Sequence, residues 1–90
     1  MIHPTIHLNG TSPEALRDAY EEALVAVRGA VRALAGCCPN ARDYYPQGDE
    51  AFVQAAQEHR ERMRRLTETA ADLEALVNRV QDTIDERNAR

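Results

Sequence analysis

The chain has 90 residues, of which 43% are hydrophobic, 4% aromatic and 29% charged, and its formal net charge is −4. A chain of this length forms one small domain, which we expect to cover residues 1–90. No run of eighteen apolar residues is present, so a transmembrane helix is excluded, and the start lacks the pattern of a secretory signal. The acidic balance argues against general nucleic-acid binding. We therefore expect a cytoplasmic protein.

The composition is typical of long helices and coiled coils, since 42 of the 90 residues are Ala, Glu, Leu or Arg. The two cysteines, Cys37 and Cys38, are neighbours and do not form the spaced disulfide framework of a small secreted domain. We expect both thiols to be reduced and to pack as small apolar groups at the end of a helix.

Residues 1–10 are predicted to form a short extended arm. Ile2, Ile6 and Leu8 alternate with other residues as they would in a strand, but Pro4 favours an edge strand or an irregular arm. An Asn-Gly pair closes the arm and predicts a turn.

The first helix is predicted over residues 12–36. Thr11 and Glu14 have the spacing of a capping box, and Ser12 followed by Pro13 gives an alternative start at the same boundary. A stripe of apolar residues then repeats with the period of a helix. Its members are Leu16, Tyr20, Leu24, Val27, Val31 and Leu34.

A loop over residues 37–48 is followed by a second helix, predicted over residues 49–88. The apolar stripe of this helix alternates steps of four and three without interruption, which is the heptad pattern of a coiled coil. Its members are Phe52, Ala56, His59, Met63, Leu66, Ala70, Leu73, Val77, Val80 and Ile84. The predicted fold is therefore all-α, an antiparallel two-helix hairpin of coiled-coil type.

In a tightly connected hairpin, Leu34 would lie opposite Phe52 and Leu16 opposite Ala70. The second helix would then extend beyond the first by roughly 18 Å. We expect a second copy of the chain to cover this overhang, giving a homo-oligomer (a dimer or larger), although the N-terminal arm is long enough to cover it instead. The predicted oligomer interface contains Leu73, Leu76, Val77, Val80 and Ile84.

Positive charge collects at the loop end of the predicted hairpin. Residues 28–65 carry a net charge of +2, whereas residues 1–27 and 66–90 each carry −3. Arginine recognises phosphate oxygens, and tyrosine rings stack on bases, so this end is a candidate site for a nucleotide-like anion. The alternative is a solvated surface of weak ion pairs, with a tyrosine closing the hairpin end. The candidate ligand-binding residues are Arg42, Tyr44, Tyr45, Arg28, Arg32, Arg60 and Arg64.

Catalysis and metal binding find no support in the sequence. His59 lies on an apolar stripe, where a buried, hydrogen-bonded histidine is more common than a ligand or a base. His3 and His7 with the two cysteines do not have the spacing of a zinc site. No glycine-rich phosphate loop is present. We expect a protein that is not an enzyme and that carries no metal or cofactor.

Two segments carry a resemblance to known proteins: Ile-His-Leu-Asn-Gly-Thr-Ser at residues 6–12 and Arg-Asp-Tyr-Tyr-Pro-Gln-Gly at residues 42–48. Together with the two-helix pattern, they resemble small uncharacterised helical proteins encoded by bacteriophages and prophages. The resemblance implies an accessory phage protein in a bacterial cytoplasm, or a minor virion or assembly component. It assigns no functional residue.

Two functions are compatible with these expectations. The first is sequestration of a small, nucleotide-derived immune signal of the host, by analogy of fold with helical, oligomeric phage proteins that bind such signals. The alternative is a protein–protein interaction module, which would inhibit a host protein or form part of a phage assembly.

Overall fold

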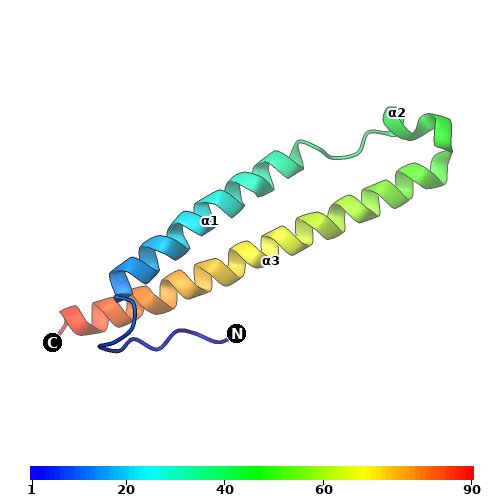
Figure 1. The fold of residues 1–90 in the computed structure, drawn as a ribbon. Coiled ribbons are helices and arrows are strands. Elements are labelled where there is room, and N and C mark those ends of the chain that lie inside the picture. Colours follow the sequence, from blue (N-terminus) through cyan, green and yellow to red (C-terminus); the bar gives the residue numbers. More distant parts are fainter.

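The computed structural model describes all residues 1–90, of which 78% are helical, and contains no strands. Helix α1 spans Pro13–Ala35, the short helix α2 spans Ala41–Tyr44, the 3₁₀ turn η1 spans Tyr45–Gln47, and helix α3 spans Asp49–Asn88. The long helices α1 and α3 lie side by side in opposite directions and form a rod of 65 × 21 × 20 Å (Figure 1). The prediction of an all-helical chain with a long helix pair is confirmed. None of the helices has the length and apolar character needed to cross a membrane.

Helix α1 begins at the second of the two starts that the sequence allowed. The Ser12 Oγ accepts a hydrogen bond from the Ala15 amide at 3.1 Å, and Pro13 occupies the first helical turn, where its missing N–H costs nothing. The helix ends at Ala35, and the amide of the capping residue Gly36 donates to the Ala33 carbonyl at 3.1 Å. Local sequence chemistry therefore determines both ends of α1.

The connection between α1 and α3 covers nearly the residues of the predicted loop but is more structured. After Gly36 the chain runs past the end of α1 without regular structure and then forms α2, whose first turn is capped by the Asn40 Oδ1 accepting from the Arg42 amide at 3.0 Å. The turn η1 follows, and Gly48 adopts φ 97° and ψ 164° before α3 begins. The first turns of α3 consequently lie beyond the end of α1 (Figure 1).

This connection makes the predicted helix register wrong. The Arg17 Nη1 donates to the Gln81 Oε1 at 3.2 Å, and the Arg28 Nη2 lies 3.2 Å from the Glu74 Oε2. Relative to the predicted pairing of Leu16 with Ala70, these two contacts displace α1 along α3 by 12 and 16 residues, which is about 18–24 Å. The overhang of α3 is therefore at its N-terminal end rather than at its C-terminal end.

The core lies where the sequence predicted an oligomer interface. Leu24 from α1 and three residues of that predicted interface, Val77, Val80 and Ile84, are buried within the single chain, and Val80 is only 2% exposed. Leu73 and Leu76 are half-buried. The premise of an uncovered C-terminal overhang is wrong, because the displaced α1 covers this part of α3.

The N-terminal arm packs on its own chain. Residues 3–6 share a shallow hollow with Arg79 and Thr83 of α3, and the arm follows the C-terminal half of that helix (Figure 1). The Gly10 amide donates to the His7 carbonyl at 3.1 Å in the turn that the Asn-Gly pair predicted. The arm thus adds a third segment to the buried end of the rod.

Candidate functional site

The predicted loop residues gather around α2, at the far end of the rod from the termini. Tyr44 is half-buried, with its ring 6.5 Å from the Phe52 ring of α3. Tyr45 is 83% exposed, and Arg42 is exposed beside it. Tyr44 and Tyr45 line a hollow of about 270 Å³ against α3. The structure therefore brings these three candidate residues together, with Tyr44 anchored and the other two open to solvent.

The remaining candidate arginines do not converge on this place. Arg28 pairs with Glu74 across the middle of the helix pair. Arg64 pairs with Glu61 and Glu68 along the surface of α3. Arg32 and Arg60 are exposed and take part in no ion pair. The seven residues proposed for one anion site are thus distributed over separate surfaces.

The cluster around Arg64 has a defined electrostatic effect. Hydrogen bonds from the Arg64 guanidinium, supported by the charges of Arg64 and Arg65, lower the pKa of the exposed Glu61 carboxyl below its ordinary value. Hydrogen bonds to Glu61 and Glu68 in turn raise the pKa of Arg64. Stabilisation from a carboxyl group with a lowered pKa is present above its ordinary pKa and is lost as the pH falls through the lowered value.

We expect Arg64→Gln to return the Glu61 pKa toward its ordinary value, because the glutamine keeps a polar group but removes the charge that favours the carboxylate. An NMR titration of the Glu61 carboxyl carbon measures this change. Arg60→Gln is the matched control and should leave the Glu61 midpoint in place. An unchanged midpoint in the Arg64 variant would contradict the assignment.

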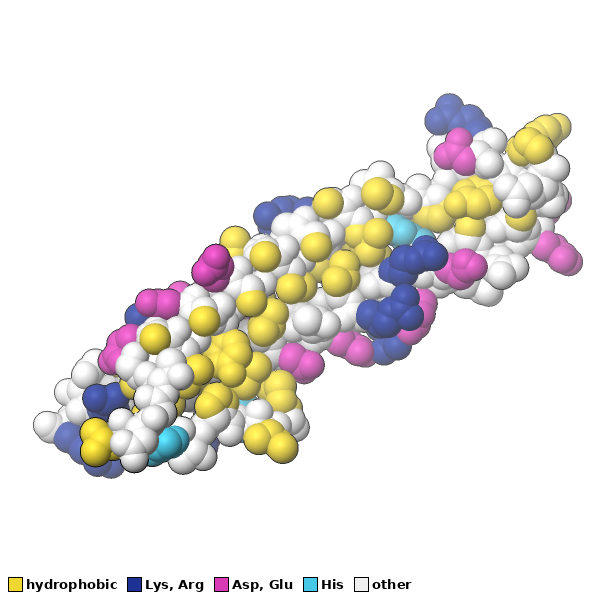
Figure 2. All heavy atoms as spheres, viewed as in Figure 1, with side chains coloured by type: hydrophobic (Ala, Val, Ile, Leu, Met, Phe, Trp, Pro, Cys, Tyr) yellow, Lys and Arg dark blue, Asp and Glu magenta, His cyan; other side chains and the backbone are white.

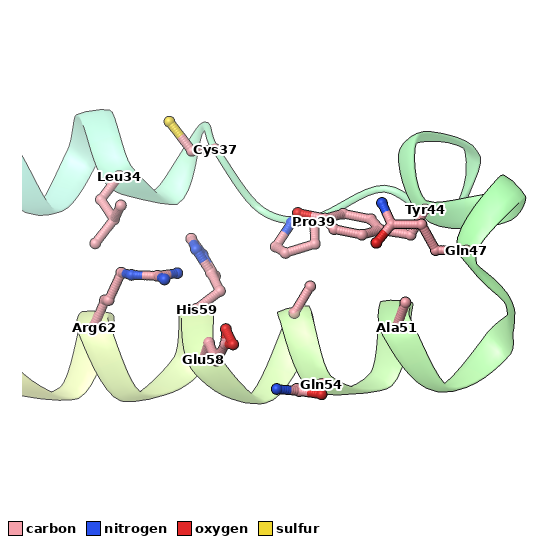
Figure 3. A pocket seen from close by; sticks show the side chains of 11 residues that line it. Leu34, Cys37, Pro39, Tyr44, Gln47, Ala51, Gln54, Glu58, His59 and Arg62 are labelled. Carbon is pink, nitrogen blue, oxygen red and sulfur yellow. The ribbon is translucent and has the colours of Figure 1, made fainter.

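The largest hollow of the molecule lies elsewhere, between the end of α1, the connecting segment and α3 (Figure 3). It has a volume of about 480 Å³ and is open to solvent. We call it the α1-end pocket. Its polar lining is Gln47, Gln54, Glu58, His59 and Arg62, and the rest of its lining is Leu34, Cys37, Pro39, Tyr44, Ala51 and Ala55.

His59 is the unusual member of this lining. Its side chain is only 8% exposed, and its ring extends from α3 into the gap below α1 (Figure 3). The sequence predicted a buried histidine with a hydrogen bond, and the hydrogen bond is missing. The structure contains no buried polar side-chain atom that lacks a hydrogen-bond partner. The unpaired ring nitrogens of His59 are therefore accessible to solvent, and the pocket that His59 lines gives that access. The guanidinium of Arg62, which takes part in no ion pair, extends toward the same ring.

Sequence reasoning identified Tyr44 and noted His59, but it missed Arg62, Glu58 and the two glutamines. The available signal was a polar residue on an otherwise apolar stripe, with Glu58 directly before it and Arg62 one turn after it. Whether such a polar position faces a pocket depends on which part of α1 lies opposite it. The incorrect register placed the wrong part of α1 there. A hollow forms here because α1 ends at this level of α3.

Cys37 borders the α1-end pocket, whereas Cys38 is not part of its lining. Cys37 and Cys38 are free and exposed, so the prediction that they pack as apolar groups is wrong. The Cys37 Sγ lies 3.5 Å from the Ala33 carbonyl oxygen and points away from the pocket (Figure 3). No group of three or more His, Cys, Asp or Glu side chains is placed to hold a metal ion.

Comparisons of the chain with protein-family models, with curated proteins and with solved structures find no match.

Proposed function

We propose that this protein is a non-enzymatic protein–protein interaction module that works as a homo-oligomer, with a dimer as the smallest form. The supporting observation is its surface. The single chain exposes 6740 Å², whereas a compact monomer of 10.1 kDa exposes about 5,300 Å². Its radius of gyration is 19.3 Å, compared with about 12 Å for a compact domain of this length.

The excess surface includes the open sides of the helix pair. Two helices form a single layer. Apolar side chains between them are covered by the neighbouring helix but have no second layer above or below them. Val27, Val31 and Leu66 are half-buried, and Val25 is 66% exposed. Figure 2 shows apolar side chains along much of the length of one side of the helix pair. A second copy laid on it would complete a four-helix bundle.

The size of the excess surface fits a second copy of the chain as the partner. If each chain buried about 1,400 Å² of excess surface, the interface would exceed 2,000 Å² in total, which is the range of obligate homodimers. The interface proposed here is the open side of the helix pair around Val25. It replaces the C-terminal residues of α3 as the centre of the contact, because three of those are already buried in the single chain.

The test is the mass in solution, measured by native mass spectrometry and by light scattering after gel filtration. At micromolar concentration we expect about twice the chain mass of 10.1 kDa. Val25→Asp should shift the distribution toward monomer, because it places a charge in the apolar contact. Ala26→Asp carries the same charge on a neighbouring exposed position and should leave the mass unchanged. A monomeric unmodified chain would contradict the proposal.

The exposed end around α2 is the surface that we propose for a further partner. Arg42 and Tyr45 project there from a segment that Tyr44 anchors to α3, and arginine and tyrosine are both enriched in protein interfaces. The resemblance to phage-encoded proteins would make this partner a host protein or a component of a phage assembly.

Sequestration of a small, nucleotide-derived anion is the second candidate function. The observation that favours it is the α1-end pocket, in which the unpaired His59 faces solvent beside Arg62. Of the residues first considered for such a ligand, Tyr44 alone lines this pocket.

A further inference from the structure

We infer that the α1-end pocket binds a small aromatic acid, with its flat ring against the apolar wall and its single carboxylate or phosphate at His59 and Arg62. This inference deepens the second candidate function, on which it rests, by assigning the site and the class of ligand. It does not depend on self-association.

His59 is the buried polar residue of the pocket. Positions along the same stripe of α3 carry Phe52, Met63 and Leu66, whereas position 59 carries an imidazole that is 8% exposed and has no hydrogen-bond partner in the protein. Its ring nitrogens are unpaired but not sealed from solvent, so they are free to bond a ligand that enters the pocket. The ring faces a pocket of about 480 Å³, so there is room for such a partner.

Arg62 determines that the ligand carries a negative charge. It lies one helical turn after His59, and its guanidinium extends toward the imidazole (Figure 3). Four other arginine–carboxylate pairings are made in the structure, but none involves Arg62. A guanidinium presents only N–H donors, and the imidazole beside it can supply a further N–H, so the two groups suit a carboxylate or a phosphate.

The opposite wall determines the shape of the ligand. Pro39 and the Tyr44 ring lie together on the far side of the pocket, with Leu34 at its other end (Figure 3). The Tyr44 ring is held in place by its contact with Phe52. A volume of about 480 Å³ lies in the range of small-molecule sites, and flat rings pack well on tyrosine. These features favour an aromatic ring as the body of the ligand.

Glu58 limits the charge of the ligand. It is the only carboxylate in the lining, and it lies beside His59 on α3 (Figure 3). A carboxylate repels a second anionic group and accepts a hydrogen bond from a hydroxyl or an N–H. Gln47 and Gln54 can bond further ring substituents. The lining therefore selects a ligand with one anionic group and a hydrogen-bond donor over a polyphosphate.

The test is isothermal titration calorimetry on the full chain, with NMR shifts of the His59 ring to locate the site. The probes are 4-hydroxybenzoate and adenosine 5′-monophosphate, which present a carboxylate and a phosphate on a flat ring. Inorganic phosphate, acetate and adenosine 5′-triphosphate are the comparison ligands. We expect one or both aromatic monoacids to bind at millimolar concentration or below, and to bind more tightly than each comparison ligand.

Two variants locate the contacts. Arg62→Gln should weaken binding by about tenfold or more, because it removes a charged hydrogen bond to the anion. Arg60→Gln, two positions away and outside the lining, should leave the affinity unchanged. His59→Leu should also remove binding, and since leucine suits an apolar stripe, its circular dichroism should show that the helix pair is retained.

The outcomes separate this inference from the function on which it rests. If neither monoacid binds, or if the triphosphate binds more tightly than the monophosphate, the inference is overturned. If adenosine 5′-monophosphate binds with equal strength to the wild-type, Arg62→Gln and His59→Leu proteins, nucleotide sequestration stands but the site assignment fails. If 4-hydroxybenzoate binds and the nucleotide does not, the site assignment stands and nucleotide sequestration fails.

Discussion

Val80→Asp is expected to destabilise the helix pair strongly. Val80 is the most deeply buried side chain of the chain, at 2% exposure, in the part of α3 that α1 covers. An aspartate there would carry its charge, or its unpaired carboxyl group, into an apolar contact, which costs about 3–5 kcal/mol. A domain of this size has a total stability of only about 5–13 kcal/mol. Urea unfolding followed by far-UV circular dichroism should show a large loss, with a marked fraction unfolded without denaturant.

Val53→Asp is the matched control for this prediction. It makes the same substitution in the same helix, at a position that is 53% exposed and lies in the overhang beyond α1. We expect its effect to stay within about 0.5 kcal/mol, as for ordinary surface changes. Equal losses in the two variants would show that the α1–α3 contact does not centre on Val80.

Gly48→Ala is expected to destabilise the chain by about 1–3 kcal/mol. Gly48 has φ 97° and ψ 164°, a backbone region that residues with a Cβ atom rarely adopt. The space around it is open, because an added Cβ would meet no atom within 4 Å. The expected loss therefore comes from backbone strain alone, and the free energy of urea unfolding measures it.

Gly29→Ala should change stability in the opposite direction. Gly29 lies inside α1, where an added Cβ would meet only the Arg32 Nη2, at an ordinary contact distance of 3.9 Å. Replacing a helical glycine by alanine stabilises a helix by about 0.5–1 kcal/mol. If the free energy of unfolding falls in Gly48→Ala and rises in Gly29→Ala, the loss at position 48 comes from its backbone conformation and not from the removal of a glycine in general. If Gly48→Ala were as stable as Gly29→Ala, the turn before α3 would not require glycine.

The two long helices could be predicted because their signals are local. The cap at Ser12 and the apolar stripe that follows it identify α1, and the heptad pattern identifies α3. Their register could not be predicted in the same way. A continuous stripe from Phe52 to Ile84 of α3 offers apolar partners to α1 at many positions. The choice between them depends on the path of residues 36–48, which is a tertiary property.

The candidate site was predictable only in part for the same reason. Tyr44 stood out as an aromatic residue in a dense turn segment, and its contact with Phe52 is consistent with a tyrosine that closes the end of the helix pair. His59 stood out as a polar residue on an apolar stripe. Arg62 gave no signal of its own among several arginines on α3, since its role depends on where α1 ends.

The return of the N-terminal arm along α3 has a practical consequence for experiments. Met1 lies alongside the rod, away from its tip, whereas Arg90 lies at the tip itself (Figure 1). A tag or fluorophore joined to Met1 would leave from the flank of the molecule, where it competes for space with anything that docks alongside. The same label joined to Arg90 would prolong the long axis. Attachment sites for labels are therefore better chosen at the C-terminal end.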